Sequence, residues 1–150
     1  MPALARFISP RFSTRRFLAF LFSIGCLLIL PQCSEKNSAD YVQEGMAYIE
    51  QQDFGKAETA FLKAIEKNPK NPEAHYGVGG IYNYRRQYEK AKAAFRNALK
   101  SDPTHFDAHY SLGYAHEQLG ENEAAEKEFA VYNRLRKKMD AALKKEQVKR

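Results

Sequence analysis

The chain has 150 residues and a formal net charge of +6 at neutral pH, from 24 Lys and Arg against 18 Asp and Glu. This length supports at most one ordinary domain. The charge is uneven, because residues 1–33 hold four Arg and no acid, residues 34–133 hold 12 Lys and Arg against 16 Asp and Glu, and residues 134–150 hold 8 against 2. An acidic body with a basic tail offers no continuous phosphate-binding face, so no nucleic-acid partner is expected.

The first 32 residues have the pattern of an export signal. Arg15 and Arg16 precede an uncharged apolar stretch over residues 17–30, and Pro31 begins an abrupt change to polar residues. As a helix this stretch would span about 21 Å, which is short of the ~30 Å hydrocarbon core of a bilayer. The pattern therefore predicts a signal peptide over residues 1–32 and an exported protein.

Both cysteines of the chain lie in or next to this leader. Cys33 ends the apolar run and begins a polar tether over residues 33–37, which resembles the lipid-modified cysteine of bacterial lipoproteins. Gln32 departs from that pattern, which prefers Gly, Ala or Ser before the cysteine. Modification at Cys26 would leave the apolar residues 27–30 at the mature N-terminus, so Cys33 is the predicted lipidation site. The alternative is an unmodified leader cysteine, and in either case no intramolecular disulfide is expected in the mature protein.

From residue 38 the sequence repeats with a period of 34 residues. Gly45, Gly79 and Gly113 are spaced by this period. The same spacing relates three further sets, which are Ala57, Ala91 and Ala125; Phe61, Phe95 and Phe129; and Pro69 and Pro103. We therefore predict three repeats and a basic C-terminal helix or tail, over residues 38–71, 72–105, 106–139 and 140–150.

Each repeat is predicted to form two amphipathic helices. In the second repeat, apolar residues recur at three- and four-residue steps on both sides of a short break. Asn71 before Pro72 supplies an N-cap and a proline in the first helical turn. Pro69 and Pro103 stop the preceding helices, because proline has no N–H and its ring clashes with the turn before it.

The third repeat departs from the other two at its C-terminal end. Lys137 stands where the other copies have proline, so the second helix of this repeat need not stop. Leu135, Met139 and Leu143 continue an apolar stripe that Lys and Arg residues surround. We expect the extended helix to cap the array by covering the exposed face of the third repeat.

The repeats resemble the tetratricopeptide repeat, a helix–turn–helix unit of 34 residues. The match covers residues 38–139 and is strong in the first two copies, which read Tyr41, Gly45, Tyr48, Phe54, Ala57, Phe61, Ala64 and Pro69, then His75, Gly79, Tyr82, Tyr88, Ala91, Phe95, Ala98 and Pro103. The resemblance implies an all-α solenoid of three helix–turn–helix repeats with an extended C-terminal capping helix.

Two histidines recur with the period and could suggest a catalytic pair. His75 and His109 occupy an aromatic position of the family at a helix-pair contact, so we interpret them as structural. Glu73 and Asp107, two residues before them, lie on another helical face. His105 and His109 have the spacing of two metal ligands, but His105 falls at the expected start of a helix. Without a phosphate loop or an HExxH pattern, we expect no metal, no cofactor, no small-molecule substrate and no enzymatic activity.

In this family the first helices of the repeats line a concave surface that binds partners. Tyrosine is common on recognition surfaces because it offers a large contact area and a hydroxyl. The alternative is that some of these side chains pack between helices. Gly77 and Gly80 either leave room for a ligand backbone or admit a neighbouring helix. The resemblance places nine side chains on the concave surface, namely Val42, Met46, Ile49, Tyr76, Asn83, Tyr84, Tyr110, Tyr114 and Glu117.

One subtype of the family clamps the C-terminal carboxylate of a peptide with Lys, Asn and Arg. The matching positions of this sequence hold no cation, and they are Val42, Met46, Gly77, Asp107 and Ser111. With Glu73, Asp107 and Glu117 nearby, we expect a neutral or basic segment instead.

These patterns favour a non-catalytic interaction scaffold. It would be lipid-anchored in the bacterial cell envelope and would bind a peptide or helix of a partner protein in the concave groove. The alternative is a structural assembly factor or an oligomer subunit of an envelope complex. An envelope enzyme is the third reading and has no visible reactive site in its favour.

Overall fold

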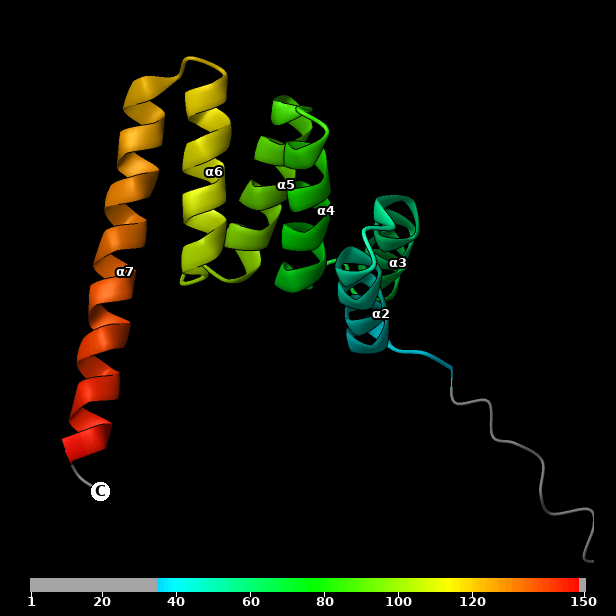
Figure 1. Cartoon of the computed structure of the whole chain (residues 1–150), viewed down its shortest axis with the longest axis horizontal. Helices are drawn as coiled ribbons and strands as arrows, with labels where there is room; N and C mark the ends of the chain where they lie inside the picture. Colours follow the sequence, from blue (N-terminus) through cyan, green and yellow to red (C-terminus); the bar gives the residue numbers. More distant parts are fainter. Residues whose placement is uncertain (1–34, 149–150) are drawn as a thin grey trace, which may run out of the picture. The chain divides into compact units, whose positions relative to one another are not determined.

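The computed structural model describes residues 35–148, so the predicted signal peptide (residues 1–32) and the candidate lipidation site Cys33 lie outside the described residues. In this part of the chain the regular structure is all helical, which confirms the predicted fold class (Figure 1). None of its helices has the length and apolar character needed to cross a bilayer. The helices are α2 (Ser38–Glu50), α3 (Phe54–Lys67), α4 (Pro72–Tyr84), α5 (Tyr88–Ser101), α6 (Phe106–Gln118) and α7 (Asn122–Val148).

Side-chain caps determine where the first helix of each pair begins. The predicted N-cap of α4 is confirmed, because Asn71 Oδ1 accepts a hydrogen bond from the backbone N–H of Ala74 at 3.0 Å and Pro72 is the first helical residue. Asn37 caps α2 in a reciprocal capping box with Asp40. Each such cap stabilises a helix by about 1 kcal/mol because it satisfies an N–H that the helix itself cannot.

A left-handed residue ends the turn that follows each first helix. Gln52, Arg86 and Gly120 have φ angles of 60°, 58° and 76°, and they are separated by the 34-residue period. In each turn the next backbone N–H reaches back to a carbonyl of the first helix at 2.8–2.9 Å, in the pairs Asp53–Tyr48, Gln87–Tyr82 and Glu121–His116. Of the three turns, the one at Gly120 avoids the steric cost that this conformation has for residues with a Cβ.

A phenylalanine ring packed against a glycine joins the two helices of each pair. A Cβ placed on the glycine would lie 2.7, 2.5 or 2.8 Å from a ring carbon in the pairs Gly45–Phe61, Gly79–Phe95 and Gly113–Phe129, respectively. These distances are too short for any real side chain, so the close approach of the helices requires glycine. Phe61 and Phe95 are only 2% and 0% exposed, so both rings lie in the core.

Helix α7 is longer than its partner in the third pair. It has 27 residues and α6 has 13, so the two helices span about 40 Å and 20 Å. The C-terminal part of α7 continues past the N-terminal end of α6 (Figure 1). There Met139 and Leu143 are 40% and 51% exposed. The predicted extended helix is therefore present, its first half packs against α6, and Leu135 is half-buried. The expectation that Met139 and Leu143 cover the third repeat is wrong, because the helix extends beyond the neighbour that they would cover.

Substitution of neighbouring glycines tests the packing. Gly79→Ala should lower the free energy of unfolding by about 1–3 kcal/mol, because the new methyl group would overlap the Phe95 ring. Gly80→Ala is the matched control on the same helix. It has no atom within 4 Å of the new Cβ, so it should raise stability by about 0.5–1 kcal/mol. Urea denaturation of both variants measures the difference, and equal effects would contradict this packing.

Candidate partner-binding groove

The first helices of the three pairs form one continuous layer. The backbone of helix α4 lies close to those of both α2 and α6, whereas the backbones of α3 and α5 lie farther apart. Because neighbours approach more closely on the side of the first helices, that side is the concave one. The predicted binding surface therefore lies on α2, α4 and α6.

A groove of about 490 Å³ opens between α2, α3 and α4. This volume lies in the range of ~300–1,000 Å³ that is usual for ligand pockets. Glu50 of α2 and Glu73 of α4 contribute its carboxylates, and the other lining residues are uncharged and mainly apolar. The groove is lined by Met46, Ile49, Glu50, Phe54, Phe61, Glu73, Tyr76, Gly77, Gly80 and Ile81.

Three of the predicted site residues come together in this groove, namely Met46, Ile49 and Tyr76. Val42 does not, because it is 6% exposed and belongs to the core around Phe61. Its placement on the concave surface is therefore corrected, since α2 turns this side chain toward α3 and α4. Tyr76 is half-buried and also packs against Phe95, with ring centroids 5.8 Å apart. Burial raises the pKa of the Tyr76 phenol above its ordinary value.

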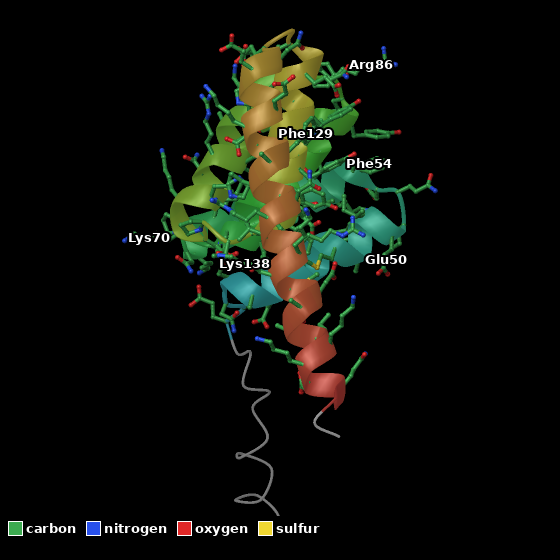
Figure 2. The ribbon with its side chains drawn as sticks, turned by 90° about the vertical axis from the view of Figure 1, so that its left-hand side faces the viewer. Glu50, Phe54, Lys70, Arg86, Phe129 and Lys138 are labelled. Carbon is green, nitrogen blue, oxygen red and sulfur yellow. The ribbon has the colours of Figure 1, made fainter. Side chains whose placement is uncertain are left out.

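Two more predicted residues lie at the C-terminal end of α4. The Tyr84 ring stacks on Phe54 with centroids 4.2 Å apart, so contact with α3 holds this exposed tyrosine in place. Asn83 is half-buried, and its Oδ1 atom is buried without a hydrogen-bond partner. In Figure 2, Phe54 and Glu50 lie on one side of the helix stack and Lys70 lies on the other.

The predicted residues of α6 do not line the groove. Tyr110 packs against Phe129 and Tyr132 of α7, with centroids 5.6 and 5.2 Å apart. Tyr114 meets Tyr88 edge-on at 6.3 Å, and Glu117 is exposed. Of the nine predicted residues, three line the groove over the first two repeats, Val42 lies in the core, two lie at the end of α4 outside the groove lining, and three lie on a separate surface of the third repeat.

Gly77 and Gly80 of α4, for which two roles were open, differ in what surrounds them. A Cβ on Gly77 would meet the Phe61 ring at 2.6 Å, so Gly77 admits the neighbouring helix. Gly80 has open space beside it and borders the groove, so a ligand can approach its backbone. Glu50 and Phe54 line the groove without being among the predicted site residues, although Glu50 directly follows the predicted Ile49.

The first helices carry acidic side chains and no Lys or Arg. Helices α2, α4 and α6 contain six Asp and Glu and no Lys or Arg, whereas α3, α5 and α7 contain every helical Lys and Arg of the described part. A sequence signal for this was present, because the charges alternate between first and second helices. The six acidic residues are Asp40, Glu44, Glu50, Glu73, Asp107 and Glu117.

The two periodic histidines make equivalent structural contacts. The Nε2 atoms of His75 and His109 hydrogen-bond to the carbonyls of Pro69 and Pro103 at 2.9 and 3.2 Å. Each bond ties a first helix to the turn before it. No group of three or more His, Cys, Asp or Glu that could hold a metal occurs within residues 35–148.

A partly buried ionic network lies where α5 meets the turn between α6 and α7. The ammonium of the buried Lys92 donates to both carboxylate oxygens of Glu121 at 2.8 and 3.1 Å, and buried His116 also hydrogen-bonds to Glu121. The hydrogen bond from Lys92, followed by that from His116, lowers the pKa of Glu121 below its ordinary value. Hydrogen bonding to Glu121 raises the pKa of Lys92.

Comparison with known families agrees with the arrangement of the helices. A model described as "Tetratricopeptide repeat" matches residues 83–142, and one described as "TPR repeat" matches residues 45–83. The chain belongs to the tetratricopeptide repeat (TPR) family. A comparison with curated proteins gave no match.

Several solved structures share the fold, and two of those described here are TPR domains. The second TPR domain of Spaghetti (RPAP3), bound to the HSP90 peptide SRMEEVD, aligns with a TM-score of 0.65 at 18% identity over 67% of this chain and 93% of its own. MamA aligns with a TM-score of 0.65 at 25% identity over 70% of this chain and 61% of its own. The Sgt2 TPR domain of Aspergillus fumigatus aligns with a TM-score of 0.62 at 23% identity over 66% of each chain.

The Lys92–Glu121 network should make the third repeat sensitive to acid. Because the folded-state pKa of Glu121 is lowered, its contribution is present above the ordinary pKa of 4.5 and is lost as the pH falls through the folded-state value. Glu121→Gln should lower the melting temperature at neutral pH and weaken its decline in acid. The matched control is Glu117→Gln, which changes an exposed carboxyl four residues away. Equal pH profiles for wild type and Glu121→Gln would contradict this role.

Proposed function

We propose that this TPR protein is a non-catalytic adaptor that holds a basic or neutral segment of a partner protein in the groove between its first two repeats. The observation that carries the proposal is the apolar groove between Glu50 and Glu73, in a layer of first helices without any Lys or Arg. Apolar side chains of the segment would occupy the groove, and flanking Lys or Arg would meet the carboxylates.

A contrast with the Spaghetti complex supports this choice of ligand. Its peptide, SRMEEVD, ends in acidic residues. The first helices of this chain offer no Lys or Arg to pair with such a peptide, and the groove carboxylates of Glu50 and Glu73 would repel it. A segment of opposite charge fits better.

We also propose that the protein is exported and lipid-anchored in the bacterial cell envelope. Support comes from the arginine-flanked apolar leader, from Cys33 at its end and from the polar tether that follows. Within residues 35–148 no helix is suited to span a bilayer. The tether would leave the groove free to capture its partner close to the membrane.

A second candidate function is that of an oligomer subunit. The exposed apolar stripe on the C-terminal part of α7 favours it, since a large apolar side chain in that position is covered only by contact with another molecule.

Charge-graded peptides test the function of the groove. Helical peptides with a common Leu–Met–Leu stripe and with Lys, Gln or Glu flanks should bind the chain from Ser34 onward in the order Lys, Gln, Glu, measured by fluorescence anisotropy. Ile49→Ala should weaken binding of the Lys peptide by about 2 kcal/mol if Ile49 is an anchor residue. The double change Glu50→Lys with Glu73→Lys should reverse the order of the peptides.

The matched control is Tyr114→Ala, because Tyr114 is 37% exposed like Ile49 but lies outside the groove. It should leave binding unchanged. Phe61→Ala should instead cost about 3–5 kcal/mol of folding stability. Binding that is independent of flanking charge, or equal loss from Ile49→Ala and Tyr114→Ala, would contradict the proposed site.

The anchor is tested by Cys33→Ser in the full chain. This change should release the protein from the membrane fraction or leave its leader uncleaved, because the thiol that receives the lipid is missing. Cys26→Ser should have no effect and serves as the control. Mass spectrometry that finds an unmodified mature N-terminus at another residue would refute lipidation at Cys33.

A further inference from the structure

The C-terminal part of α7, residues 134–148, projects from the helix stack with an amphipathic surface. Leu135, Met139 and Leu143 follow one another at four-residue steps, so they lie on one side of the helix. Leu135 is half-buried, and the other two are among the exposed large hydrophobic residues. Lys138 lies on this projecting half, whereas Phe129 lies on the half that packs against α6 (Figure 2).

This projecting half is strongly basic. It contains six Lys and Arg against Asp140 and Glu146, a net charge of +4. Two such helices brought side by side would repel each other, so direct pairing of two projecting halves is disfavoured. An acidic apolar surface is the complementary partner.

The groove of the same chain has that complementary character. Its floor includes Met46, Ile49 and Phe54, and Glu50 and Glu73 stand among its lining residues. The stripe from Leu135 to Leu143 is about 12 Å long, so it offers up to three anchoring side chains to such a groove. Lys and Arg on both sides of the stripe could pair with the carboxylates of the first helices.

The projecting half cannot enter the groove of its own molecule. Helix α7 is uninterrupted from Asn122 to Val148, and contacts with α6 hold its first half in place, including a 2.6 Å bond between His109 and Glu128. The groove lies between the first and second helix pairs, on α2, α3 and α4, whereas α7 belongs to the third pair. The α7 helix would have to break to bring the stripe there.

We infer that the projecting half of α7 binds the groove of a second copy of this chain. This inference rests on the proposed function of the groove and names one segment that it accepts. The contact is head-to-tail, since it joins different surfaces of the two copies, and so it leaves one groove and one projecting half free for further copies. Self-association therefore competes with capture of a partner protein at the same site.

A complementation experiment tests the inference on the chain from Ser34 onward. The groove variant carries Glu50→Lys with Glu73→Lys, and the tail variant carries Met139→Gln with Leu143→Gln. Sedimentation velocity should show that the wild type grows with concentration and dissociates at high salt, whereas each variant alone stays monomeric. An equimolar mixture should form a one-to-one complex, because the groove variant keeps its tail and the tail variant keeps its groove.

Four outcomes would overturn the inference. The first is that the wild type is monomeric at every concentration, and the second is that the oligomer survives either pair of substitutions. The third is that the two monomeric variants fail to associate when mixed. The fourth is that the tail binds anionic lipid vesicles while the protein stays monomeric. Circular dichroism checks that both variants fold, as expected for changes at exposed positions. The charge-graded peptides report separately on the groove, so binding of the Lys peptide by a monomeric wild type would refute self-association and leave the proposed function standing.

Discussion

The contact between a phenylalanine ring and a glycine of the facing helix is the interaction on which this structure depends. It sets the distance between the helices of each pair, and no residue with a Cβ could replace the glycine without moving the ring. Phe61 extends this role, because its ring also meets Gly77 and so joins the first pair to the second. The same ring forms part of the groove lining. Packing between helices and the shape of the binding surface therefore have one common cause.

The charges of the protein follow the layers that this packing creates. First helices face the concave side and carry only acidic charges, whereas the second helices carry the lysines and arginines. This separation gives the groove a negative charge, although the net charge of the whole chain is positive. Affinity for a segment would come from apolar contact in the groove, and selection between segments would come from charge.

The third repeat differs from the others because its second helix does not stop. Pro69 and Pro103 end α3 and α5 within two residues, while α7 continues for 27 residues. The partly buried Lys92–Glu121 contact ties α5 to the start of this helix, and the bond between His109 and Glu128 ties it to α6. The first half of α7 is held in place by these contacts, and its second half projects with a basic surface. This arrangement makes the second half of α7 available for binding to another molecule.

The sequence by itself determined the helices, their limits and their pairing. N-caps, stop prolines and the 34-residue period act through contacts within a few residues or between adjacent helices, so the linear pattern contains them. It also indicated an acidic concave surface with tyrosines. Only the tertiary structure decided that Val42 enters the core while Met46 and Ile49 line a groove, that Phe54 supports Tyr84, and that the α6 tyrosines lie apart. The direction of each side chain relative to its neighbours depends on how helices of different repeats pack, and residues distant in sequence determine that packing.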